Sequence, residues 1–270
     1  MKPIGVFDSG VGGLTVVKEL LRQLPGEEIV YFGDTARVPY GIKSKETVIR
    51  FSIENILFLL KHEVKLICVA CNTVSSFALA EIKNNFKVPI VGVIRPGAQE
   101  AVSATRNKRI GIIGTKGTVK SRAYENEIKQ LDPAVKVIAA PCPLFVPFVE
   151  EGWLSGNVVR SVVKYYLKPL KKAGIDTLIL GCTHYPLLKN LIKDELGKKV
   201  ILIDSARQVA IEVSKILAGE GLLRKAKQGE PVCPAARHKF FVSDNPEWFS
   251  SLAERFLGRP VKNVKRVNNV

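Results

Sequence analysis

The chain has 270 residues, 46% hydrophobic and 24% charged, which excludes a disordered protein and allows one large domain or two smaller ones. Its formal net charge of +16 would suit nucleic-acid binding. However, the basic residues are spread along the chain apart from one run at 255–266, no nucleic-acid motif accompanies them, and we favour a lysine-rich surface. No stretch approaches the roughly 18 apolar residues of a membrane span, and the first residues lack a signal peptide's apolar core, so we expect a cytoplasmic protein without membrane contact.

Short runs of β-branched residues alternate with amphipathic stretches, which is typical of an α/β protein with mostly parallel sheets. In the first part of the chain we expect strands at residues 4–7, 28–32, 66–70 and 89–93, and helices at residues 14–24, 45–63 and 73–86. A glycine-rich loop follows the first strand, and a polar loop follows the second. Loops at the carboxyl ends of such strands are where open α/β sheets bind ligands.

The alternation begins again at residue 109, where a strand at 109–113 precedes a Gly-Thr-Lys-Gly loop and a helix. Further strands are expected at 135–139, 177–180 and 200–203, and helices at 157–173 and 186–195. The remainder predicts a helix at 206–217, a polar stretch at 219–234, a strand near 240–242, a helix at 246–256 and a strand near 261–267.

The two halves of the chain can be aligned with each other. Residues 4–9 (IGVFDS) match 110–115 (IGIIGT), residues 66–73 (LICVACNT) match 177–184 (TLILGCTH), and residues 89–93 match 200–204. The second match places Cys71 on Cys182. Three matches in the same order indicate an internal duplication.

This duplication predicts two pseudo-symmetric, three-layer α/β domains with equivalent loops facing each other across a cleft. We expect residues 1–97 plus 207–270 to form the first domain and residues 98–206 the second. Ligands of open α/β sheets bind beyond the carboxyl ends of the strands, so we expect the active site in the cleft between the domains.

Two of the five cysteines, Cys71 and Cys182, each follow an apolar strand and precede a predicted helix. The positive end of a helix dipole lowers the pKa of a thiol from about 8.5 and favours the thiolate. A single cysteine in such a place is usually a small core residue. Two at equivalent positions of a duplicated fold, each beside polar residues, indicate acid–base chemistry instead.

The remaining cysteines carry no pattern of a reactive site. An odd number of cysteines argues against a disulfide framework and for free thiols in a reducing compartment. Cys68 and the next cysteine have C-x-x-C spacing, but a redox dithiol needs both sulfurs at a turn and Cys68 lies inside a predicted strand. A zinc site would need a second such pair, which the sequence lacks. We expect Cys142 and Cys233 to be structural.

Asp8 opens the glycine-rich loop, which lacks the order of a dinucleotide-binding motif and the lysine of a P-loop. A tight turn that lets the backbone approach a small ligand is the better interpretation, with the carboxyl group near Cys71. His184 is the one histidine inside a candidate site, whereas His62 and His238 are expected at the solvated surface. The cleft offers too few ligands for a metal.

Six segments together resemble the glutamate racemases of the aspartate/glutamate racemase superfamily. They are residues 4–16 (IGVFDSGVGGLTV), 31–41 (YFGDTARVPYG), 71–76 (CNTVSS), 142–152 (CPLFVPFVEEG), 180–188 (LGCTHYPLL) and 249–258 (FSSLAERFLG). The resemblance runs essentially end to end. It implies a cofactor-independent enzyme that interconverts L- and D-glutamate by a two-base mechanism and supplies D-glutamate for peptidoglycan, with a homodimer as the expected assembly.

The resemblance also assigns roles to residues. Cys71 and Cys182 would be the two acid–base thiols; Asp8 would assist the first, and His184 with a neighbouring glutamate would assist the second. We favour Glu151 as that glutamate over the residue before it. The residues implied to hold the substrate are Asp8, Ser9, Tyr40, Gly41, Asn72, Thr73, Thr183 and His184.

Three other functions stay open at this point. Another racemase of the superfamily, acting on aspartate or a hydantoin, would share the two thiols. A two-lobed protein that closes on a small ligand without catalysis would not need two reactive cysteines. The positive charge leaves nucleic-acid binding as a secondary activity, which a salt-sensitive interaction with duplex DNA would support. No lysine motif indicates pyridoxal phosphate.

Overall fold

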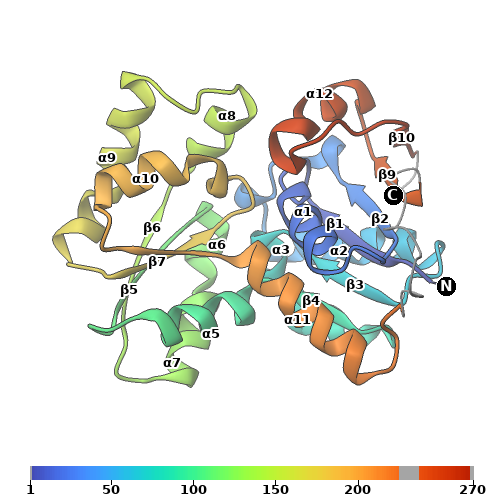
Figure 1. The fold of residues 1–270 in the computed structure, drawn as a ribbon, viewed down its shortest axis with the longest axis horizontal. Helices are drawn as coiled ribbons and strands as arrows, with labels where there is room; N and C mark the ends of the chain where they lie inside the picture. Colours follow the sequence, from blue (N-terminus) through green and yellow to red (C-terminus); the bar gives the residue numbers. More distant parts are fainter. Residues whose placement is uncertain (1, 225–236, 268–270) are drawn as a thin grey trace.

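The computed structural model describes residues 2–224 and 237–267, which form two α/β lobes, each built around one sheet (Figure 1). The first lobe holds a six-stranded sheet in the order β10-β9-β2-β1-β3-β4, and the second a four-stranded sheet in the order β6-β5-β7-β8. Every strand pair in both sheets is parallel. The predicted fold class is confirmed.

The first lobe combines both ends of the described chain. Its strands are β1 (Ile4–Asp8), β2 (Ile29–Gly33), β3 (Leu66–Val69), β4 (Ile90–Gly92), β9 (Lys239–Val242) and β10 (Lys265–Arg266). Its helices are α1 (Leu14–Gln23), α2 (Lys45–Leu60), α3 (Asn72–Phe77), α4 (Leu79–Asn85), α11 (Ser205–Gly219) and α12 (Pro246–Leu257), and short 3₁₀ turns are η1 (Thr35–Arg37) and η2 (Tyr40–Ile42). The central strands are buried at every position because helices cover both faces of the sheet, which explains their continuous apolar runs.

The second lobe repeats this architecture with fewer strands. Its strands are β5 (Arg109–Gly114), β6 (Lys136–Pro141), β7 (Thr177–Gly181) and β8 (Ile201–Asp204). Its helices are α5 (Ile94–Ala104), α6 (Lys116–Ser121), α7 (Ala123–Leu131), α8 (Phe145–Glu150), α9 (Asn157–Lys172) and α10 (Lys189–Leu196), with the 3₁₀ turn η3 (Tyr185–Leu188).

The strand order supports the duplication inferred from the sequence. The order β2-β1-β3-β4 in the first sheet equals β6-β5-β7-β8 in the second, with β9 and β10 added to the first. Ile4 pairs with Leu66 in the first lobe, and Ile110 pairs with Thr177 in the second. The loops after β3 and β7, which carry the two cysteines, are therefore equivalent in the two lobes.

Some local predictions were wrong. The helix expected at 73–86 is divided into α3 and α4 at Ala78, and the strand expected at 261–267 is confined to β10. Helices α5 and α8 were not predicted; each has a proline in its first turn, Pro96 and Pro147, where proline is tolerated although it discourages a prediction from sequence. Most of the polar stretch at 219–234, including Cys233, lies outside the described residues.

Helix α11 joins the two lobes. It begins directly after β8 and packs against α1 and β4 of the first lobe as well as α5. The proposed domains, residues 1–97 plus 207–270 and residues 98–206, differ from these lobes only in the first residues of α5 and α11, which the proposed boundaries divide.

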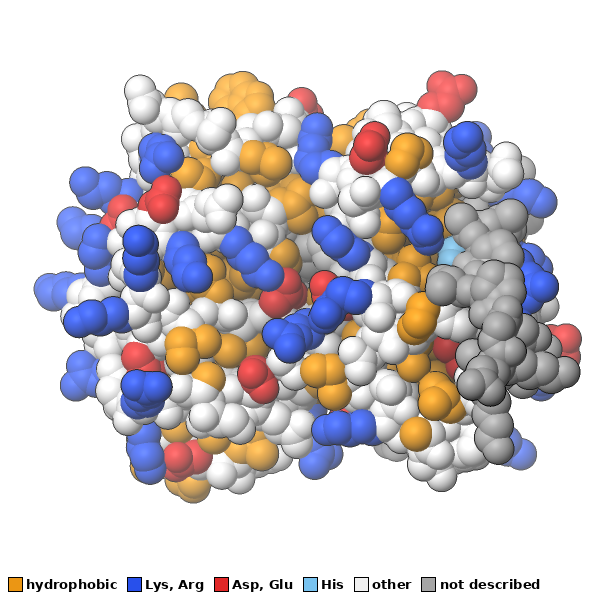
Figure 2. All heavy atoms as spheres, in the orientation of Figure 1, with side chains coloured by type: hydrophobic (Ala, Val, Ile, Leu, Met, Phe, Trp, Pro, Cys, Tyr) orange, Lys and Arg blue, Asp and Glu red, His pale blue; other side chains and the backbone are white. Residues whose placement is uncertain are grey.

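The surface is rich in lysine and arginine. On the face drawn in Figure 2 these side chains are spread over both lobes. Within residues 2–224 and 237–267, no helix combines the length and the apolar character needed to cross a bilayer.

Candidate active site

A cavity of about 370 Å³ lies between the lobes, beyond the carboxyl ends of both sheets. Loops that follow β1, β2 and β3 line it from the first lobe, and loops that follow β5, β6 and β7 line it from the second. Both predicted cysteines are in this lining. The lining residues are Ser9, Gly10, Val38, Pro39, Tyr40, Gly41, Ile42, Cys71, Asn72, Thr73, Thr115, Lys116, Pro143, Val146, Pro147, Glu150, Cys182, Thr183 and His184.

Cys71 lies directly before α3, and its thiol donates a hydrogen bond to the Ser9 hydroxyl at 3.7 Å. Burial, followed by the nearby Asp8 carboxyl group, raises the pKa of Cys71 to about 12. The expectation of a lowered pKa was therefore wrong for this thiol, because desolvation outweighs the N-terminal end of a short helix. The protonated form of Cys71 is therefore favoured at neutral pH.

Asp8 is fully buried behind the glycine-rich loop and does not line the cavity itself. Its Oδ2 accepts hydrogen bonds from the backbone N–H groups of Gly10 at 3.2 Å and Gly13 at 2.9 Å. Its Oδ1 has no partner within the described residues. Burial raises the pKa of Asp8, although His184 and the backbone donors act in the opposite direction. The carboxyl group thus holds the glycine-rich loop that borders the cavity.

Cys182 follows β7 and lies next to a chain of acid–base groups. Its Sγ is 3.9 Å from Nδ1 of His184, and Nε2 of that imidazole is 2.9 Å from Oε1 of Glu150. Burial lowers the pKa of His184, but hydrogen bonds with Cys182 and Glu150 outweigh it and raise the pKa to about 10. The charged imidazolium is therefore favoured at neutral pH, and it places a positive charge beside the Cys182 sulfur.

The structure corrects the choice between the two adjacent glutamates. Glu150 ends α8 with its carboxylate against His184, whereas Glu151 is exposed and absent from the cavity lining. Arg255 of α12 fixes this end of the helix, because its Nη1 donates to the carbonyl oxygens of Val149 and Glu150. Adjacent residues of a helix point about 100° apart, so only one of the pair can face the histidine.

The other residues implied to hold the substrate all line the cavity, namely Ser9, Tyr40, Gly41, Asn72, Thr73, Thr183 and His184. Tyr40 is buried, and its hydroxyl group contacts Asp34 and accepts a hydrogen bond from Nδ2 of Asn55 at 3.3 Å. Gly41 lies so close to the second lobe that a Cβ atom there would come within 2.6 Å of Thr115 Cβ. The loop after β2 therefore closes one side of the cavity against the other lobe.

Hydroxyl groups bridge the lobes beside the cysteines. Thr73 Oγ1 is 3.0 Å from Thr115 Oγ1, and Thr15 Oγ1 donates to the carbonyl oxygen of Thr183 at 3.3 Å. A Cβ atom on Gly12 would lie 2.3 Å from Thr183 Oγ1. The glycine-rich loop thus packs directly against the second cysteine loop, which explains why glycine is needed there.

Tyr124 was missed by the sequence analysis. This buried residue of α7 donates its hydroxyl proton to Oδ1 of Asn72 at 2.8 Å, and the same hydroxyl lies 2.8 Å from Oγ of Ser205. Since the amide oxygen of Asn72 is occupied, its NH₂ group is left as the donor. Thr115 was also missed, although the aligned repeats place it opposite Ser9 and so contain a signal for it.

Two histidines differ from their predictions. His238 is buried, and its Nδ1 accepts a hydrogen bond from the backbone N–H of Ile29 at 3.3 Å, while half-buried His62 stacks on Phe241 at 4.8 Å. Neither takes part in the site. No group of three or more His, Cys, Asp or Glu residues able to hold a metal occurs in the described part of the chain.

The chain is similar to known proteins over nearly its full length. The Asp/Glu/Hydantoin racemase family matches residues 4–212. Glutamate racemase from Geobacter metallireducens is 50% identical over 267 residues, covering 99% of this chain and 97% of the relative. The crystal structure of glutamate racemase isoform RacE1 from Bacillus anthracis has a TM-score of 0.92 at 44% identity, covering 99% and 97% of the two chains. That of glutamate racemase from Francisella tularensis in complex with D-glutamate has a TM-score of 0.90 at 40% identity, with the same coverage. The chain belongs to the Asp/Glu/Hydantoin racemase family.

Proposed function

We propose that this chain is a glutamate racemase that interconverts L- and D-glutamate without a cofactor, using Cys71 and Cys182 as its two bases. The observation that carries the proposal is the arrival of two thiols, from equivalent loops of the two lobes, at one cavity. Enantiomers have equal free energies, so a reversible catalyst needs one acid–base group on each face of the α-carbon. Similarity to glutamate racemases at up to 50% identity supports glutamate rather than aspartate as the substrate.

The groups beside the two thiols suit deprotonation of L-glutamate by Cys182. His184 lies beside Cys182, which takes the α-proton as a thiolate and becomes a thiol. Cys71, protonated at neutral pH, then delivers its proton to the opposite face and becomes a thiolate. For D-glutamate the two roles are exchanged. Each turnover thus moves one proton onto one sulfur and one proton off the other.

The rest of the site stabilises the carbanion and the substrate's carboxylates. The amide donor of Asn72 and the hydroxyls of Thr73, Thr183 and Ser9 lie on the cavity wall as preorganised donors. Glu150 orients His184, and Asp8 holds the glycine-rich loop. We further propose that the enzyme is a cytoplasmic homodimer that supplies D-glutamate for peptidoglycan.

Isotope exchange tests the proposal. Protein without added cofactor is incubated with L- or D-glutamate in D₂O, and we expect loss of optical activity with deuterium at Cα. Cys71→Ser and Cys182→Ser should each abolish racemisation. Cys142→Ser is the matched control, because that buried thiol only donates to the carbonyl oxygen of Ala140, which a hydroxyl can also do. Full activity in either of the first two variants would refute the two-base assignment.

A further inference from the structure

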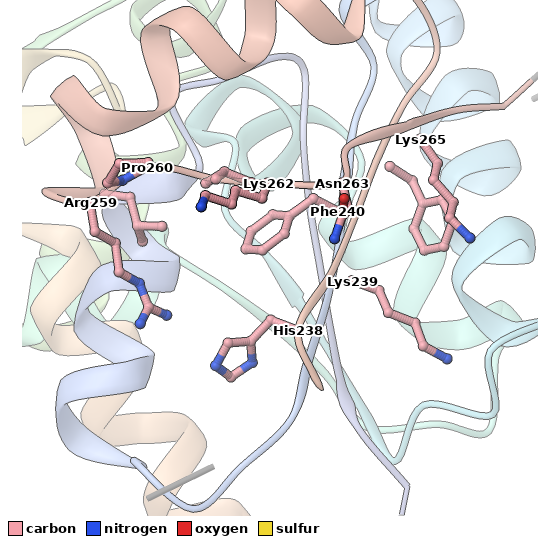
Figure 3. Close-up of a pocket in the computed structure, with 11 residues that line it drawn as sticks. His238, Lys239, Phe240, Arg259, Pro260, Lys262, Asn263 and Lys265 are labelled. Carbon is pink, nitrogen blue, oxygen red and sulfur yellow. The ribbon is translucent and has the colours of Figure 1, made fainter. Parts of the chain in front are cut away.

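A second, larger cavity of about 700 Å³ lies at the far edge of the first sheet, where the chain after α12 runs beside β9 (Figure 3). None of its lining residues belongs to the candidate active site. Four exposed cations surround it: Lys239 on β9, Arg259 directly after α12, and Lys262 and Lys265 on the terminal segment. The basic run at 255–266, which the proposed reaction does not use, thus contributes three of the four charges.

These four charges have no acidic partner in the described ranges. No Asp or Glu is among the described residues that line the cavity, and none of the four cations forms an ion pair with a described residue. The nearby acids are already paired: Glu28 with Arg224 and Arg237, and Asp244 with Arg266. Cations gathered around a concave surface reinforce one another's positive potential, so the cavity attracts anions.

The floor of the cavity adds a polar group and an apolar surface. His238 and Phe240 project toward it in Figure 3, and both are mostly buried, at 8% and 6% exposure. Burial, followed by the charge of Arg259, lowers the pKa of His238, so this imidazole is neutral at physiological pH. Because its Nδ1 accepts from Ile29, the proton of the neutral ring is on Nε2, which is left as a donor.

We infer that this cavity binds a small molecule bearing two or more phosphate groups. Four cations, one on β9 and three on the segment after α12, can pair with several anionic oxygens, and lysine and arginine are the side chains that pair best with phosphate. The volume is that of a small-molecule site. The buried ring of Phe240 offers little surface for stacking successive bases, which favours a small ligand over a nucleic-acid strand. Nucleotides and inorganic polyphosphates share the required chemistry.

Calorimetric titration of the full chain tests this inference. The two probes are tripolyphosphate and ATP, both without metal, at low and high salt. We expect binding of one molecule per chain that weakens as salt rises. Equal affinities for the two probes would assign the site to the phosphate chain alone, and tighter binding of ATP would assign it to a nucleotide; both support the inference.

A matched pair of double variants locates the site. Arg259→Glu/Lys262→Glu should weaken binding of both probes by about tenfold or more, the range expected for losing hydrogen bonds to a charged group. Lys120→Glu/Lys168→Glu changes the net charge by the same amount at exposed positions elsewhere and should leave binding unchanged. Racemase activity and the unfolding temperature of each variant verify that it is folded. Since none of these residues lies in the candidate active site, this result does not depend on the proposed reaction.

Three outcomes would overturn the inference. The first is absence of binding of either probe to the unaltered chain. The second is an equal effect of the two double variants. The third is tighter binding of a single-stranded oligonucleotide than of ATP, lost in Arg259→Glu/Lys262→Glu, which would make a nucleic-acid strand the ligand of this surface.

Discussion

The contact between Glu150 and His184 provides the sharpest test of the site. Replacing Glu150 by Gln keeps the size of the side chain and removes its charge. The carboxylate is one of the groups that raise the pKa of His184 to about 10, so its loss lowers that pKa. The His184 imidazole is charged at pH values below its pKa, and it loses that charge as the pH rises through the pKa. The variant therefore loses the imidazolium, and with it the positive charge beside Cys182, at lower pH than the unaltered enzyme.

The size of the effect follows from the geometry. The bond between Glu150 and His184 is 2.9 Å long and only partly exposed, and a hydrogen bond to a charged group contributes about 1.5–3 kcal/mol. One pKa unit corresponds to about 1.4 kcal/mol, so the alkaline limb of the pH profile should move down by about one to two pH units. The ratio of kcat/KM of the unaltered enzyme to that of the variant should consequently be about five- to fiftyfold larger at pH 10 than at pH 7, because half of the unaltered enzyme's imidazole is itself uncharged at pH 10.

Measuring kcat/KM for both enantiomers from pH 6 to 10.5 checks this prediction. Titration of the substrate's own amine cancels when the two proteins are compared at each pH. Glu151→Gln, which removes the same charge from the exposed neighbour, is the control and should follow the unaltered profile. A pH-independent ratio for Glu150→Gln, or a shifted profile for Glu151→Gln, would refute the assignment of Glu150 to the site.

Three further substitutions test two contacts between the lobes and one ion pair within the first lobe. Tyr124→Phe frees the amide of Asn72 to rotate, so KM for both enantiomers should rise by about tenfold in steady-state assays, while unfolding in urea changes by about 1 kcal/mol or less. Gly12→Ala should abolish racemisation because its methyl group would overlap the second cysteine loop; Gly219→Ala, with nothing within 4 Å, should keep full activity. Lys65→Met breaks a buried ion pair of 2.6 Å and leaves a buried carboxylate, so urea unfolding should show a loss of about 3–5 kcal/mol.

The duplication was readable from sequence because it repeats strand patterns, whose apolar runs are continuous when both faces of a sheet are covered. Cys71 and Cys182 were found in the same way, because each follows such a strand. Two features were beyond this reasoning. The pKa of Cys71 depends on how deeply its thiol is buried, and the choice of Glu150 depends on the rotation of a short helix that begins in a proline-containing segment.

Contacts between residues distant in the sequence were also beyond reach. Tyr124 meets Asn72 only because α7 packs near α3, and no local pattern marks a tyrosine that orients an amide 52 residues away. Thr115 is different, since its place opposite Ser9 in the aligned repeats made it predictable. A repeat therefore predicts equivalent positions well and contacts between the repeats poorly.

The two thiols are equivalent in the fold but not in their surroundings. Asp8 ends β1 beside Cys71, whereas the aligned residue at the end of β5 is Gly114, and Cys182 relies instead on His184. Such asymmetry is compatible with racemisation. Because the equilibrium constant between enantiomers is one, kcat/KM must be equal in the two directions whatever groups support each thiol. Only kcat and KM taken separately can differ. Equilibrium therefore does not require the duplicated halves to keep matching partners, and each half could acquire its own means of holding a proton.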